Sequence, residues 1–292
     1  MIDRETVTMA PKLTHDFTLA REAGIAVDRW PESHEEAQRL EEILAKELQS
    51  LSVDEQEKVI FEVHGLPTHG EEGDPTEEEK KLKELDDELS AAKSKSAYDK
   101  ALEWNPEYPS NINFRLMFLR YCKYDIKLTA SMIVYHFEQK KKLFGDGPIL
   151  GRDVRQSDLN EMDTAVLESG VFQILRERDA SGRTIFFMAS GLIDNMPKDR
   201  HIENEFRVMW YLTMLTLVDE ETRKMGMLGL TMNFNSHKLP IDFFLGFSHI
   251  DAAIPVKTSG FHYCYNDPNL KPYLAGFQVF LNGEYRHKVR TH

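Results

Sequence analysis

The stretch MLGLTMNFNSHKLPIDFFLGFSHIDAAIPVKTSGFHYCY, residues 227–265, decides the fold class. Residues 227–234 and Gly260–Tyr265 are short apolar and aromatic runs that are typical of buried strands, and Ile241–Ile250 between them predicts an apolar helix. A strand, a helix and a second strand in this order make a unit whose two strands pair in parallel. The stretch therefore predicts an α/β fold.

The same alternation continues on both sides of this stretch. Further strands are expected at Val171–Leu175, Thr184–Ala189 and Lys288–Thr291, and long helices at about Ile202–Lys224 and Leu270–Glu284. Strands that alternate with helices of this length indicate a mixed, largely parallel sheet with helices on its faces.

The N-terminal half follows a different pattern. Residues 1–30 show weak periodicity and are expected to be a flexible N-terminus. Residues 31–148 predict a helical N-terminal region, because apolar side chains recur there at three- and four-residue steps. The glycines and proline of Gly145–Pro148 place the boundary to a second domain, which covers residues 149–292.

An acidic insertion interrupts the helical region. Between Glu71 and Glu88, ten acidic side chains stand beside three lysines. Such a pattern is typical of a solvated helix face. The alternative is an acidic docking surface for a basic protein partner, and the sequence leaves both interpretations open.

The overall charge and apolar runs limit the classes of partner. The chain has 292 residues and a net charge of −13, which argues against nucleic acid, since phosphate binding requires cations. The longest apolar run, Phe206–Val218, is shorter than the roughly 20 residues of a membrane-spanning helix. Met1–Thr6 begins no signal peptide, and Cys122 and Cys264 are too few for a disulfide framework. We expect a cytoplasmic protein that touches membranes only peripherally.

Motifs that carry catalysis are mostly absent from the sequence. It has no glycine-rich phosphate loop, no dinucleotide-binding fingerprint and no Gly-x-Ser-x-Gly nucleophile elbow. His201 and Glu205 stand four residues apart on one predicted helix, which is the usual spacing of a surface pair. His262 and Cys264 supply two ligands, whereas zinc needs three or four. We therefore expect no enzyme activity, no metal and no cofactor.

The C-terminal half carries an excess of apolar and aromatic side chains. Periodic apolar residues belong to a core by default, yet a ligand cavity is lined by the same kinds of side chain. Both interpretations stay open for the candidate binding residues, which are Trp210, Met214, Phe243, Phe247, Phe261, Tyr263, Tyr273, Leu274, Phe277, Phe280 and Leu281.

Four motifs in a fixed order resemble the CRAL-TRIO family of lipid-binding proteins. FRLMFLRYCKYDIKLTA (114–130) is similar to the helix pair that opens the family's fold, and DASGRTIFF (179–187) to its Asp-x-x-Gly-Arg strand entry. IPVKTSGFHYCYNDP (254–268) resembles the family's Tyr-Pro…Asn-x-Pro segment, and RHKVRTH (286–292) its closing basic strand. The resemblance covers roughly residues 112–292.

The resemblance implies a helical lobe packed on an α/β lobe whose sheet floors a hydrophobic pocket. Members of the family bind one lipid or another lipophilic small molecule, and many move it between membranes. A mobile helix gates the pocket, and by position this gate is the predicted helix Leu270–Glu284. Anionic and zwitterionic lipids, tocopherols, retinoids and squalene are all within the family's range of ligands.

Two departures from the family pattern bear on the ligand. The phosphatidylinositol-transfer branch has a glutamate after Tyr-Pro that works with a lysine in the gate segment. Val256 stands at the first position, and Gln278 and Val279 stand where the lysine falls. The sequence therefore favours a neutral or less polar ligand over an inositol phospholipid. The alternative is a protein-interaction module that keeps this fold, has a filled pocket and docks through the acidic helical region.

Overall fold

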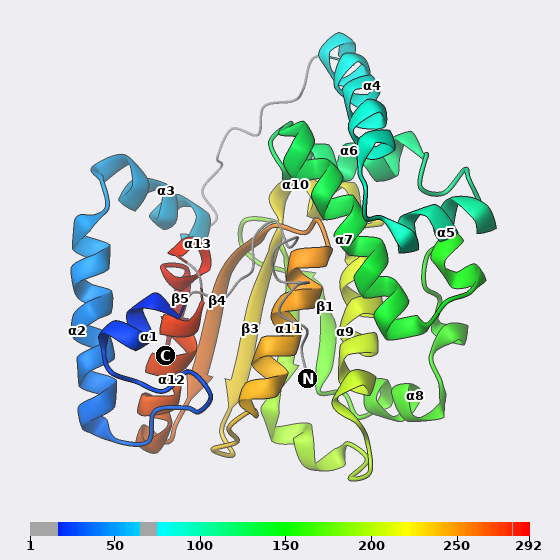
Figure 1. Ribbon diagram of the computed structural model, residues 1–292. Helices are drawn as coiled ribbons and strands as arrows, with labels where there is room; N and C mark the ends of the chain where they lie inside the picture. The colour runs from blue at the N-terminus through cyan, green and yellow to red at the C-terminus, as the bar shows by residue number, and fades with distance from the viewer. Residues whose placement is uncertain (1–16, 65–74, 282) are drawn as a thin grey trace.

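The computed structural model describes residues 17–64, 75–281 and 283–292 as an α/β fold around one five-stranded sheet (Figure 1). The strand order is β1-β2-β3-β4-β5; β1 and β2 are antiparallel, and the other three pairs are parallel. The strands are β1 (Phe172–Arg178), β2 (Thr184–Ala189), β3 (Met227–Asn233), β4 (Thr258–Tyr265) and β5 (Val289–Thr291). All five lie where the sequence predicts strands, and the α/β class is confirmed.

The helices that connect the parallel strands cover one face of the sheet, which we call the covered face. Each connection joins two neighbouring parallel strands, and such crossovers are right-handed, so successive helices fall on the same side. Ring contacts agree with this: Phe243 stacks 6.2 Å from Phe172 of β1, and Tyr273 lies 6.4 Å from Tyr263 of β4. These helices are α9 (Ile202–Thr216), α10 (Glu220–Met225), α11 (Ile241–Ala253), α12 (Lys271–Phe280) and α13 (Gly283–Arg286).

The remaining helices lie at the two ends of the sheet (Figure 1). Beside β5 are α1 (Thr18–Glu22), α2 (His34–Ser50) and α3 (Val53–His64). On the side of β1 and α9 are α4 (Pro75–Ala91), α5 (Ser96–Trp104), α6 (Ile112–Tyr121), α7 (Ile126–Phe144) and α8 (Glu161–Glu168). The helices expected over 31–148 are thus divided between both ends.

The segment expected to be a flexible N-terminus is packed where the structure describes it. Ala20, Ala23 and Ile25 are buried in one cluster with side chains of α2 and α12. Residues 1–16 of that segment lie outside the described residues.

Two long helices of the sequence prediction end early in the structure. The helix expected over 202–224 breaks after Thr216, because the Asp219 carboxylate accepts a hydrogen bond from the Thr222 amide and starts α10 anew. The helix expected over 270–284 ends at Phe280. Leu281 is extended there, and the buried Arg286 guanidinium donates to the carbonyl oxygens of Val279 and Leu281.

None of the described helices is both long enough and apolar enough to cross a membrane. Within residues 17–64, 75–281 and 283–292, every helix is either too short or too polar to span a bilayer.

Candidate functional site

The middle strand of the sheet presents small residues on the covered face. Gly229 of β3 is in register with Phe186 of β2 and Phe261 of β4, and Thr231 is in register with Met188 and Tyr263. Side chains in register on neighbouring strands point to the same face. Small residues therefore run between rows of large ones, and we call this feature the β3 trough, defined by Phe186, Met188, Gly229, Thr231, Phe261 and Tyr263.

Aromatic rings from α11 and α12 form the roof over the β3 trough. On the β2 side, Phe186 packs 6.5 Å from Phe172, which stacks in parallel under Phe243 of α11. On the β4 side, Tyr263 lies 6.5 Å from Phe277 of α12, and Phe277 touches Phe244 of α11 at 5.1 Å. These contacts place the trough between the sheet and the seam at which the two helices meet.

Residues at the centre of the β3 trough keep part of their surface exposed. Phe186, Gly229, Thr231 and Phe261 are all half-buried, although helices lie over this face. A Cβ atom on Gly229 would lie 2.7 Å from Cδ1 of Phe261, so the Phe261 ring leans over the glycine. Only glycine allows that approach without displacing the ring.

The structure distributes the sequence-predicted binding residues over three side-chain clusters. Phe261, Tyr263 and Phe277 border the β3 trough or its roof. Trp210, Met214, Phe243 and Phe247 belong to the cluster under α9 and α11, and Trp210 is fully buried beside His136 of α7. Tyr273, Leu274, Phe280 and Leu281 are buried on or next to α12.

Trp30 packs against α12, which corresponds to the predicted gate helix. Its ring stacks 5.4 Å from Phe280 and meets Tyr273 edge-on at 4.8 Å, and its Nε1 donates a 2.7 Å hydrogen bond to the Leu239 carbonyl oxygen. Gly276 leaves room for Pro31 to pack against α12. The segment before α2 thus ties α12 to the loop that leads into α11.

Sequence patterns did not point to three residues of the candidate site, which are Gly229, Thr231 and Trp30. Gly229 and Thr231 stand two residues apart in a strand of otherwise larger apolar residues, and this alternation is the signal that could have marked them. Trp30 lies in a segment of weak periodicity, and only its large apolar ring hinted at a packing role.

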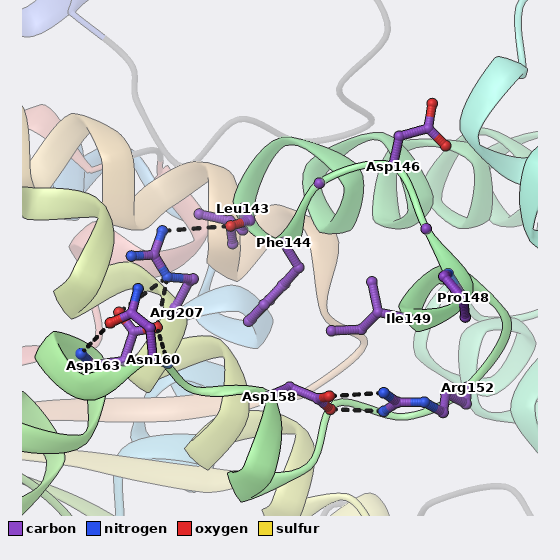
Figure 2. A pocket seen from close by; sticks show the side chains of 12 residues that line it. Leu143, Phe144, Asp146, Pro148, Ile149, Arg152, Asp158, Asn160, Asp163 and Arg207 are labelled. Carbon is purple, nitrogen blue, oxygen red and sulfur yellow. Dashed lines mark hydrogen bonds and ion pairs between the residues drawn. The ribbon is translucent and has the colours of Figure 1, made fainter.

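An opening lies between the end of α7 and the start of α8 (Figure 2). It has a volume of about 600 Å³, and Phe144 and Ile149 face its centre. Four charged side chains of its lining form ion pairs with one another. Arg207 Nε donates a 2.8 Å hydrogen bond to Asp163, and the Arg152 guanidinium donates two hydrogen bonds of 2.6 and 2.7 Å to Asp158. The opening therefore lies where the end of α7 meets α8 and α9.

The acidic insertion uses part of its charge internally. Glu78 of α4 accepts hydrogen bonds from Arg120 Nε at 2.9 Å and from the Tyr124 hydroxyl at 2.7 Å, which holds the pKa of this carboxyl below its usual range despite partial burial. Asp86 pairs with the buried Arg115. Residues 71–74 of the insertion lie outside the described residues.

Titratable groups of the described chain do not assemble a reaction centre at the trough. Burial raises the pKa of the Tyr263 and Tyr273 hydroxyls, so both stay protonated. Glu205 pairs with Arg200 at 2.7 Å and not with His201, which corrects the expected surface pair. Among the described residues, no three His, Cys, Asp or Glu side chains converge as metal ligands would.

The geometry thus brings Phe261, Tyr263 and Phe277 together with Gly229 and Thr231, and it places Trp210 in a different cluster of the core. Phe280 and Leu281 are buried in the cluster against which Phe261 and Phe277 pack. The arrangement can enclose an apolar molecule between a sheet and two helices. No family model matches the chain, and no curated protein matches it.

Proposed function

We propose that the protein binds one lipophilic small molecule, a phospholipid or another lipid, in the β3 trough. The observation that carries this proposal is the partial exposure of Phe186, Gly229, Thr231 and Phe261 on the face of the sheet that α11 and α12 cover. Apolar surface gains about 25 cal/mol for each Å² that leaves water. A lipophilic ligand that fills the trough therefore binds without any catalytic group.

The resemblance to CRAL-TRIO proteins supports the same function. In that family a mobile helix gates the pocket, and by position in the sequence this helix corresponds to α12. The side chains that define the trough are aromatic, aliphatic or small and supply no charged nucleophile or base. We therefore assign binding, and not catalysis, to this site.

Ligand entry through the seam between α11 and α12 gives the protein a role at membranes. Opening this seam separates Phe244 from Phe277 and exposes both rings. Exposed aromatic side chains are stable in the interfacial layer of a bilayer. A protein that opens on a membrane and closes in water transfers its ligand between membranes or presents it to another protein.

Titration with diphenylhexatriene, an uncharged dye that fluoresces in apolar surroundings, tests the proposal. We expect the wild-type protein to bind about one dye per chain. Gly229→Leu fills the trough and should weaken binding at least ten-fold. Met232→Phe is the matched control, because this half-exposed side chain lies on the opposite face of the same strand.

Two results would contradict the proposal. One is the absence of saturable dye binding by the wild-type protein, which favours the alternative of an interaction module with a filled pocket. The other is equal binding by Gly229→Leu and Met232→Phe when far-ultraviolet circular dichroism shows both to be folded.

A further inference from the structure

One hydroxyl in the β3 trough has no protein partner. Thr231 lies between Met188 and Tyr263 on the covered face, and its side chain is half-buried. Among the described residues, none makes a hydrogen bond to its hydroxyl. Two threonine hydroxyls elsewhere in this part of the fold are paired: Thr184 bonds Thr222 at 2.7 Å, and Thr216 donates to the Thr213 carbonyl oxygen.

The polar groups beside Thr231 already make hydrogen bonds within the protein. The Tyr263 hydroxyl accepts a 2.6 Å hydrogen bond from the Asn233 amide, whose nitrogen also donates to the His237 carbonyl oxygen. Thr258 of β4 also has a hydroxyl without a partner, but only 2% of this residue is exposed. Thr231 is therefore the accessible hydrogen-bonding group on the floor of the trough.

The side chains that define the trough around Thr231 carry no charge. The six residues that define the β3 trough are Phe186, Met188, Gly229, Thr231, Phe261 and Tyr263, and none is ionised at neutral pH. An ionised carboxylate or phosphate at this depth would be left without a cation, and the loss of its hydration would oppose binding. An uncharged oxygen loses far less hydration and regains a hydrogen bond from the threonine.

We propose that the ligand is an uncharged lipophile with one hydroxyl or carbonyl oxygen, and that Thr231 selects it by a hydrogen bond. The apolar body of the ligand lies on the Phe186 side of the trough, against the Phe261 ring that leans over Gly229. Thr231 stands in the carboxyl-terminal half of β3, and the carboxyl ends of parallel strands are where ligands of open α/β sheets bind. This inference rests on the proposed function of the trough and adds the chemical class of its ligand.

Displacement of bound diphenylhexatriene by three chains of equal length tests the inference. The competitors are 1-dodecanol, dodecane and dodecanoate, each delivered from cyclodextrin. We expect the wild-type protein to prefer the alcohol over the alkane by about three- to ten-fold, which is the usual effect of one neutral hydrogen bond. Dodecanoate should be the weakest competitor.

Variants at Thr231 separate the hydroxyl from the shape of the side chain. Thr231→Val keeps the shape and should abolish the preference for dodecanol without weakening the binding of dodecane. Thr231→Ser keeps the hydroxyl and should restore the preference. If Thr231→Val does not fold, Thr231→Ala takes its place in the comparison with Thr231→Ser.

The outcomes distinguish this inference from the proposed function. Absence of dye binding by the wild-type protein defeats both. Normal dye binding, with dodecanol and dodecane equally effective or with the preference retained in Thr231→Val, overturns only the role of Thr231. Dodecanoate as the strongest competitor overturns the assignment of an uncharged ligand.

Discussion

At the scale of single residues, two basic side chains of α7 are buried in the helical core. His136 is fully buried, its Nδ1 lies 3.0 Å from the Ala253 carbonyl oxygen, and burial lowers its pKa to about 3. Lys140 is 1% exposed, donates to the Arg152 carbonyl oxygen and lies 4.7 Å from the centre of the Tyr108 ring. Burial lowers the pKa of this lysine to about 7.

The Lys140 pKa makes stability depend on pH above neutrality. Its folded-state pKa of about 7 lies below its ordinary value of 10.5, so the unfolded chain binds more protons between these values. The contribution of Lys140 to the free energy of unfolding therefore increases as pH rises from 7 to 10.5. We expect Lys140→Met to flatten this rise, as measured by urea unfolding at pH 7, 8, 9 and 10. Parallel curves for both proteins would refute the assignment.

At the scale of elements, the end of α3 is bound to the starts of β2, β4 and β5. Glu62 pairs with Lys288 at 2.8 Å and Lys257 at 3.2 Å, and Arg183 donates to the carbonyl oxygens of Glu62 and Val63. Burial raises the pKa of the Glu62 carboxyl, but the two lysines outweigh it and hold that pKa below its usual value. The ion pairs therefore add stability while this carboxyl is ionised.

Glu62→Gln tests this junction. Because Lys288 is only 3% exposed, losing its charged partner should lower the free energy of unfolding by about 3 kcal/mol at pH 7. The folded-state pKa of Glu62 is depressed, so its contribution is present above about pH 4.5 and is lost as pH falls further. The gap between variant and wild type should therefore narrow in acid. A gap that is constant from pH 7 to pH 3 would rule out the ion pairs as its cause.

The contact between Trp30 and α12 permits a second test at this scale. We expect Trp30→Ala to lower the free energy of unfolding by about 2–3 kcal/mol, because the ring packs on Phe280 and Tyr273 but is only partly buried. If α12 gates the trough, diphenylhexatriene should also exchange several-fold faster. Trp104→Ala is the matched control, since 53% of this tryptophan is exposed. Equal exchange rates in both variants would show that Trp30 does not hold the gate.

At the scale of the whole molecule, local patterns predicted the elements well, but long-range contacts had to come from the structure. The strand Thr184–Ala189 has the predicted bounds, because its apolar run is flanked by clear turn residues. The break at Asp219 was missed because one capping carboxylate overrides a continuous apolar pattern.

The candidate site was predicted only in part. Phe261, Tyr263 and Phe277 were identified by their aromatic character. Gly229 and Thr231 were not, because a trough depends on which residues of neighbouring strands stand in register, and a single sequence does not encode register visibly. The packing of residues 17–31 on α12 joins parts of the chain that are far apart, and periodicity carries no information on such contacts.

The central claim is that the β3 trough holds a lipophilic ligand, and mass spectrometry of organic extracts tests it most directly. We expect purified wild-type protein to release close to one lipophilic molecule per chain, and the folded variant Gly229→Leu to release little or none. Extracts of wild-type protein that contain no more lipid than those of folded Gly229→Leu would contradict the claim.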